Sequence, residues 1–237
     1  MKTLREFCES DLVEFMDRTL ADVGRFNSVE EAAQCLAQGM FAECGDGARS
    51  DLALSRVFHS FEFGALPLDV QGLVRRDFGE NVPDDKLFLC LLGTYGQEPP
   101  WQHRRNSQGH QAIPLSRESI RSIPMMTRLF QQIGFDLGIL LKEDERPMNM
   151  SGLCGSYGLF YVNRAAGSPY VPAQEFVVKY GVESVFGTGV MLPSGDASIY
   201  IGFSRVALDE HVLGRLSPLM SLFWQKVFPL VAKGYFV

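Results

Sequence analysis

Apolar residues recur at three- and four-residue intervals in several stretches of the chain, which is the spacing of amphipathic helices. Between them lie short segments that alternate apolar and polar residues or are almost continuously apolar, as strands of a buried sheet do. The pattern predicts helices at about 2–23, 28–45, 69–77, 122–141, 174–180 and 209–233, and strands at about 52–63, 86–95, 159–163, 184–192 and 197–203.

The clearest local signal is the sequence Pro193-Ser194-Gly195-Asp196 between the last two predicted strands. Proline presets φ, glycine accepts positive φ and aspartate bonds to nearby backbone, so these four residues predict a tight turn. A turn this short joins antiparallel strands. Because helices and strands are intermixed, we expect an α+β fold with a central, mainly antiparallel sheet and helices packed against it.

The composition is that of a globular chain, with 237 residues, 46% hydrophobic and 21% charged residues, and a net charge of −6. An acidic chain has no general field that attracts DNA or RNA, so nucleic-acid binding is not expected. The sequence has no run of about 18 uncharged apolar residues and no signal-peptide core, so we expect no membrane span and a cytoplasmic location. Five cysteines without CxxC spacing fit reduced thiols.

The last third of the chain, GVESVFGTGVMLPSGDASIYIGFSR followed by a helix, resembles the end of a GAF domain, where a turn joins two strands before the closing helix. NSVEEAAQCLAQGM resembles the opening GAF helix, and KLFLCLLGTYGQEP resembles the second strand and its exit. GLFYVNRAAGSPYVP resembles the segment before the last hairpin. The resemblance covers residues 27–233 in outline, and it points to divergent GAF-like sensory domains of bacterial signalling proteins.

This resemblance implies a domain organisation and a role. An N-terminal helix, residues 1–26, precedes a GAF-like sensory domain, residues 27–237, and the N- and C-terminal helices pack together and form a homodimer. A small-molecule ligand binds between the sheet and the helix at 122–141, and the change passes through the terminal helices or to a signalling partner protein. The sequence identifies neither ligand nor cofactor, because the cyclic-nucleotide signature and a bilin-attaching Cys-His pair are both absent.

The most distinctive polar stretch is PPWQHRRNSQGH, residues 99–110. Two guanidiniums and an indole in one loop are able to hold a flat anion by bidentate hydrogen bonds and stacking. The alternative is a surface loop whose tryptophan packs down and whose arginines pair with acidic neighbours. Together with polar positions on predicted strands, the loop supplies five candidate ligand-binding residues: Arg104, Arg105, His110, Tyr161 and Thr188.

No catalytic residues and no metal site are predicted. The chain has no GxSxG, P-loop or Rossmann motif, and its four histidines lack the spacing of metal ligands. Cys154 lies among glycines and is the thiol expected to be most accessible, whereas Cys90 lies in an apolar strand. Two alternatives to a sensor remain: a thiol-dependent enzyme on a GAF fold, and a protein-interaction domain whose vestigial pocket is filled by Phe and Leu side chains.

Overall fold

The computed structural model describes residues 2–45, 49–143 and 158–237. Its strands form one six-stranded sheet in the order β3-β2-β1-β6-β5-β4, and every neighbouring pair is antiparallel. In chain order the elements are α1 (Glu9–Thr19), α2 (Val29–Glu43), β1 (Leu52–Glu62), α3 (Leu68–Phe78), β2 (Leu87–Gly96), β3 (Ala112–Pro114), α4 (Arg117–Ser122), α5 (Pro124–Ile133), α6 (Leu137–Leu140), β4 (Phe160–Val162), α7 (Gln174–Tyr180), β5 (Ser184–Met191), β6 (Ala197–Ser204), α8 (Glu210–Leu216) and α9 (Leu219–Val227).

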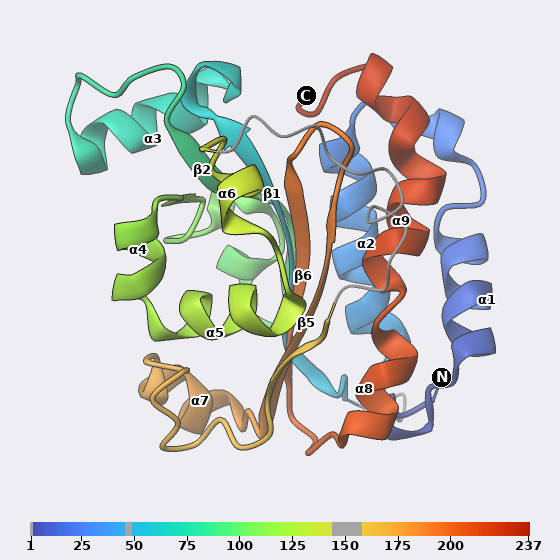
Figure 1. Ribbon diagram of the computed structural model, residues 1–237. Coiled ribbons are helices and arrows are strands. Elements are labelled where there is room, and N and C mark those ends of the chain that lie inside the picture. Colours follow the sequence, from blue (N-terminus) through green and yellow to red (C-terminus); the bar gives the residue numbers. More distant parts are fainter. Residues whose placement is uncertain (1, 46–48, 144–157) are drawn as a thin grey trace.

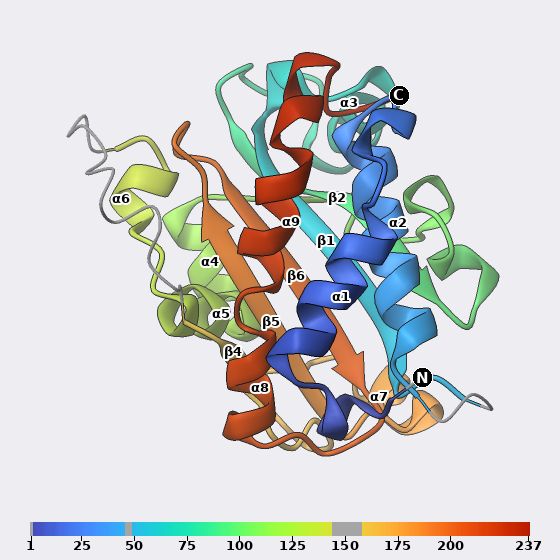
Figure 2. The same ribbon diagram turned by 90° about the vertical axis from the view of Figure 1, so that its right-hand side faces the viewer.

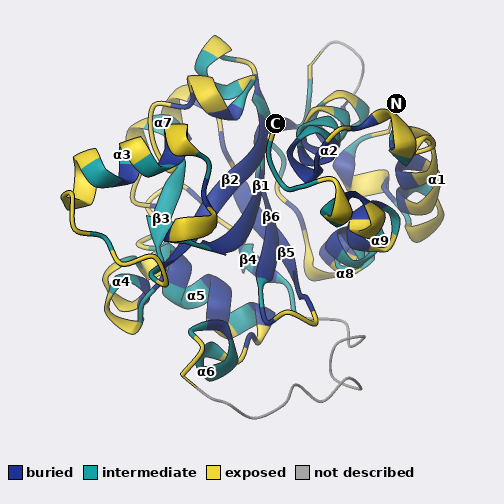
Figure 3. Ribbon diagram, turned by 90° about the horizontal axis from the view of Figure 1, so that it is seen from above, coloured by how far each residue is buried: buried dark blue, intermediate teal, exposed yellow. Residues whose placement is uncertain are grey.

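Two layers of helices enclose the sheet (Figure 1). Helices α1, α2, α8 and α9 lie on one side, which we call the α9 face, and α4, α5, α6 and α7 lie on the other, the α5 face. Figure 2 looks onto the α9 face and shows α1 in front, between α9 and α2. Seen from above in Figure 3, the long strands are buried between the layers. The predicted α+β class, a central antiparallel sheet flanked by helices, is confirmed.

The predicted hairpin is confirmed, because β5 and β6 pair along their whole length. The N–H of Gly195 donates to the carbonyl of Leu192 at 2.9 Å, and Gly195 has a φ of 88°, which favours glycine over other residues. The expected strands at 52–63 and 86–95 are β1 and β2 near the centre of the sheet. The short edge strand β3 was not predicted, since three residues are too few to show a period.

The helix expected after Asn27 is α2, and Ser28 is its N-cap because its side chain accepts the N–H of Glu31. This helix packs very close to β2. A Cβ atom on Gly93 would lie 2.3 Å from the carbonyl oxygen of Ala33, so the approach requires glycine in the strand.

The prediction of two long continuous helices, at 122–141 and 209–233, is wrong, because each range contains more than one helix. Residues 117–140 form three helices: Pro124 begins α5, since it has no N–H to donate to a preceding turn, and Gly134 ends it at a φ of 78°. The final segment forms α8 and α9, with Pro218 between them. The first helix is shorter than expected and begins at Glu9, after a separate 3-10 turn.

The predicted packing of the terminal helices is confirmed. Leu12, Phe15 and Met16 of α1 belong to the same buried cluster as Phe223 and Trp224 of α9. The apolar faces that suggested a dimer are therefore used within the chain, and the homodimer and the boundary after residue 26 stay predictions. Within the described ranges, no helix is long and apolar enough to cross a membrane.

Candidate functional site

Arg104 lies in a 3-10 turn, Arg104–Asn106, of the loop between β2 and β3, and its side chain is 1% exposed. It forms a two-pronged ion pair with Glu30 of α2, with Nε–Oε1 at 2.6 Å and Nη2–Oε2 at 3.0 Å. Its Nη1 donates to Oδ2 of Asp69 in α3 at 3.1 Å. Two carboxylates thus use all three guanidinium nitrogens, and Arg104 joins the loop to α2 and α3.

Arg105, Tyr161 and Thr188 are the next three candidates. Arg105 and Tyr161 form hydrogen bonds within the chain, and Tyr161 and Thr188 lie on the α9 face of the sheet. Arg105 is exposed and donates from Nη2 to the backbone oxygen of Val237 at 2.9 Å. The hydroxyl of Tyr161 donates to the backbone oxygen of Leu208, and its ring packs against the α9-face cluster. Thr188 is fully buried in β5, and its hydroxyl has no hydrogen-bond partner in the part of the chain that the structure describes.

His110 lies at the other end of the 103–110 segment, with a φ of 60°. Desolvation and the charge of nearby Arg56 lower the pKa of this imidazole. The structure therefore does not bring the five candidates into one cavity. Arg104 and Arg105 lie at the β2 edge, Tyr161 and Thr188 face α8 and α9, and His110 lies beside Arg56. The assignment of these five as one site stays a prediction.

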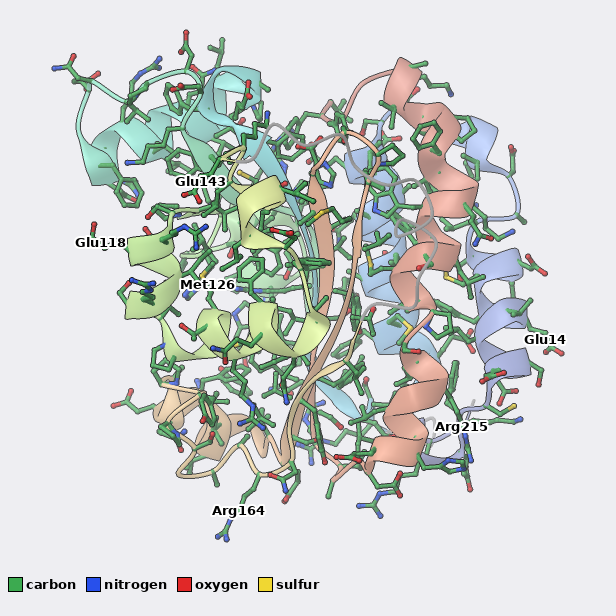
Figure 4. The ribbon with its side chains drawn as sticks, in the orientation of Figure 1. Glu14, Glu118, Met126, Glu143, Arg164 and Arg215 are labelled. Atoms are coloured by element: carbon green, nitrogen blue, oxygen red, sulfur yellow. The ribbon has the colours of Figure 1, made fainter. Side chains whose placement is uncertain are left out.

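The space between the sheet and α5 is packed with apolar side chains (Figure 4), including Met126. The hollows beside α4 and α5 open outward instead. One of about 420 Å³ is lined by polar groups of both helices, among them Arg121, Thr127 and Arg128, together with Tyr170. The buried residues that fill the α5 layer include Leu129, Phe130, Ile133, Phe135, Leu140 and Ile199.

Arg56 of β1 is the polar residue that the sequence reading missed. Its neighbours Ser55 and Val57 face α9, so strand alternation directs Arg56, like Phe58, to the α5 face. Its Nε is buried without a partner, and its Nη2 donates to the hydroxyl of Ser107 at 3.4 Å. A signal was present, because an arginine stands in the middle of a strand whose apolar residues predict burial.

The surroundings of Arg56 contain no compensating charge in the part of the chain that the structure describes. Desolvation alone lowers the pKa of Arg56 to about 10, with no carboxylate raising it. Thr94, opposite Arg56 on β2, has a buried hydroxyl that also lacks a hydrogen-bond partner within the described ranges. A buried guanidinium Nε and a buried hydroxyl that lack partners are costly, and an anion with acceptor oxygens would satisfy both.

A cleft of about 170 Å³ opens to the surface near this place, although neither Arg56 nor Thr94 lines it. It lies between α3 and the segment 107–112, and its lining includes Ser107 and His110. The same two residues surround Arg56, since Ser107 accepts its hydrogen bond and the Arg56 charge acts on His110. Arg56, Thr94, Ser107 and His110 therefore form the candidate site, which we call the Arg56 site.

The structure offers little for thiol or metal chemistry within its described ranges. Burial raises the pKa of the thiols of Cys44 and Cys90, so both stay protonated and unreactive. Cys154, the thiol expected to be most accessible, lies outside the described residues. No three His, Cys, Asp or Glu side chains among the described residues are grouped to hold a metal ion.

Comparison with known proteins gives structural likenesses only. No protein-family model and no curated protein matches the chain. The chain is similar to the GAF domain of a phosphoenolpyruvate-protein phosphotransferase from Coxiella burnetii, at 11% identity and a TM-score of 0.45, covering 95% of this chain and 98% of that one.

Two further solved structures show the same kind of likeness. One is an N-acylhomoserine lactone-dependent LuxR family transcription factor from Burkholderia cenocepacia, with 11% identity, a TM-score of 0.39, and 94% and 98% of the two chains covered. The other is the phytochrome photosensory core module of Stigmatella aurantiaca, with 10% identity, a TM-score of 0.41, and 94% of this chain and 37% of that one covered. The α+β class itself rests on the antiparallel sheet between helical layers described above.

Proposed function

We propose that the protein is a sensory domain that binds a small anionic molecule at the Arg56 site. The observation that carries this proposal is the guanidinium of Arg56, which enters the sheet's α5 face without a carboxylate partner in the described ranges. Arg presents a planar fork that matches a carboxylate or a phosphate. Thr94, Ser107 and His110 supply hydroxyl and imidazole groups around it, and we infer that the ligand enters by the cleft beside α3, which Ser107 and His110 line.

The loop between β2 and β3 supplies a relay in this proposal. Ser107 contacts Arg56 on the α5 face, while Arg104, three residues earlier, holds Glu30 near the start of α2. The Arg104 guanidinium also lies over the ring of Phe236, with 5.3 Å from its central carbon to the ring centroid. An anion that draws Ser107 and His110 toward Arg56 pulls on the loop, and the pull reaches α2 and the C-terminal segment through Arg104.

The direct test is ligand-induced stabilisation, measured by thermal unfolding and calorimetry with phosphate, acetate and succinate at matched ionic strength. We expect at least one of these anions to raise Tm in the wild type and to have no effect on Arg56→Met. The matched control, Arg121→Met, removes an exposed arginine on the same side and keeps the response. No stabilisation by any anion, or an equal response in Arg56→Met, contradicts the proposal.

The relay has its own readout in backbone hydrogen exchange. The N–H groups of Val29 and Glu30, at the start of α2, donate to the carbonyls of Gly234 and Tyr235. Anion binding should change the exchange of these two amides in the wild type and leave it unchanged in Arg56→Met. Light scattering with and without the anion then shows whether the change reaches a homodimer, as predicted, or leaves a monomer to act on a partner protein.

The packed layer under α5 favours a second candidate, an interaction domain whose pocket is filled by its own side chains. In that case Arg56 is a residue without a ligand, and its removal relieves a desolvation cost with no loss of any response. The two functions differ in one measurement: the sensor loses a Tm shift on Arg56→Met, whereas the interaction domain has no shift to lose.

A further inference from the structure

A second cavity, of about 210 Å³, lies at the far end of β1, away from the Arg56 site. The pairing of β1 with β6 ends at His59, and β1 continues to Glu62 without that neighbour. The turn of the β5–β6 hairpin, the end of α6 and the C-terminal segment close the gap. We call this space the His59 cavity. Its lining comes from β1, the turn that follows it, the end of α6, the hairpin turn and the C-terminal segment: His59, Ser60, Phe61, Glu62, Ala65, Lys142, Asp196 and Tyr235.

His59 is the buried polar group in this wall. Its side chain is 0% exposed, and neither ring nitrogen has a hydrogen-bond partner among the described residues. Burial lowers the pKa of His59 to about 3, so the ring is neutral and has one free donor and one free acceptor nitrogen. It stacks on Tyr235 at 5.0 Å between ring centroids, and Trp224 lies 5.3 Å away on the same measure.

The charges of the His59 cavity favour a cation. Glu62 forms an ion pair with Lys142, whereas Asp196 accepts a hydrogen bond from the hydroxyl of Ser194 at 2.6 Å and makes no ion pair with a described residue. Two carboxylates and one ammonium leave one negative charge in excess. Burial raises the pKa of Asp196, and the charge of Lys142, which is paired with Glu62, opposes this shift without cancelling it.

Aromatic rings complete the wall. Phe61 meets Tyr235 edge to face, with ring centroids 5.0 Å apart. Desolvation and the charge of Asp196 raise the pKa of Tyr235 to about 12, so its phenol stays neutral beside the carboxylate. A carboxylate beside aromatic rings is the combination that attracts an organic ammonium ion, through ion pairing and through the negative faces of the rings.

We propose that the His59 cavity binds a compact alkylammonium ion. Its charge pairs with Asp196, its carbon atoms pack against Phe61 and Tyr235, and one of its N–H groups donates to the acceptor nitrogen of His59. A simple inorganic cation is a poorer fit, since the described residues offer no group of three metal-binding side chains here and the imidazole requires a donor. The site is independent of the Arg56 site and takes a ligand of opposite charge.

The test uses the fluorescence of Trp224, which lies next to His59. Replacing Trp101, the other of the two tryptophans, with Phe isolates this signal. The probes are tert-butylammonium, its neutral isostere tert-butanol, and tetramethylammonium, which has no N–H. We expect saturable binding of tert-butylammonium, weaker binding of tetramethylammonium and no binding of tert-butanol. Asp196→Asn, which keeps an acceptor for Ser194, should weaken tert-butylammonium binding at least about tenfold.

Three controls make the outcome decisive. Tyr235→Leu removes the ring and should abolish the saturable signal, while Glu175→Gln, an exposed charge change on α7, should leave affinity unchanged. Arg56→Met should also leave it unchanged, so failure here and failure of the proposed function are separable. The proposal is overturned if tert-butanol binds as well as tert-butylammonium, if Asp196→Asn has no effect, or if no probe gives saturation. Equal binding of tetramethylammonium overturns the role given to His59.

Discussion

Arg104 and Arg56 both lie beside the central strands, and their surroundings differ in one respect. Arg104 has every guanidinium nitrogen on a carboxylate, shared between Glu30 and Asp69. Arg56 has a hydroxyl partner at 3.4 Å, a buried Nε without a partner and no ion pair with a described residue. The difference separates a charge that holds elements together from a charge that is available to something outside the chain.

The same contrast extends to histidine. His59 is buried without a partner, as is part of Arg56, and it lines a cavity. Unpaired buried polar groups are uncommon in proteins, and each calls for a reason such as a missing ligand. In this molecule two of them, Arg56 and His59, lie three residues apart on β1, and His59 lines a cavity while the Ser107 partner of Arg56 lines a cleft.

The largest expected effect on the free energy of unfolding comes from removing the buried ion pair between Arg104 and Glu30. Glu30→Ala leaves a buried guanidinium with Asp69 as its remaining carboxylate, and we expect it to lower the free energy of unfolding by about 3–5 kcal/mol, measured by denaturant titration. Asp69→Asn, which removes the half-exposed partner, should cost about 1 kcal/mol or less. Equal losses in the two variants would show that Glu30 is not the principal partner.

The next effect tests whether His59 is truly unpaired. Burial lowers the pKa of His59 from 6.5 to about 3. Below pH 6.5 this imidazole is therefore protonated in the unfolded chain but stays neutral in the folded chain. The contribution of neutral, buried His59 to the free energy of unfolding is complete above pH 6.5 and is lost as the pH falls toward 3. Between pH 7 and pH 5 we expect a loss of about 2 kcal/mol from this group.

His59→Phe should remove that part of the pH dependence of the free energy of unfolding, measured by denaturant titration at several pH values. His211→Gln, a change of a surface histidine on α8, should leave the pH profile as in the wild type. A profile for His59→Phe that matches the wild type would mean that His59 has a proton acceptor after all.

A smaller effect is expected from the unpaired arginine. Arg56→Met replaces a desolvated cation with an apolar side chain of similar length, and we expect no loss of stability and a gain of up to about 1 kcal/mol without ligand. The same variant loses the anion-induced Tm shift. A loss of stability comparable to that of Glu30→Ala would place Arg56 with Arg104, as a charge that is fully compensated in the fold.

The smallest effect sharpens the comparison inside one loop. Arg105 follows Arg104 directly, but it is exposed and bonds to a backbone oxygen. Arg105→Ala should therefore change the free energy of unfolding by less than about 0.5 kcal/mol. The contrast with Glu30→Ala would then show that the buried ion pair of Arg104 stabilises the fold far more than the exposed contacts of Arg105.

Much of the fold follows from local pattern. The Pro-Ser-Gly-Asp turn predicts the β5–β6 hairpin because turn chemistry acts over four residues. Helices α2 and α7 and strand β2 were located closely, since cap residues and long apolar runs are read within one element. The breaks at Gly134 and Pro218 were underestimated, because an apolar period continues across them while the backbone does not.

The candidate site followed the sequence less closely, because partners across the fold decide what a charged residue does. The sequence by itself determined five of the six strands, the hairpin and the α+β class, since these depend on turn chemistry and periodicity along the chain. Only the tertiary structure decided that Arg104 meets Glu30, 74 residues away, while Arg56 meets no described carboxylate. The physical reason is that burial removes water from both arginines, and whether a charge is then satisfied depends on which elements pack beside it.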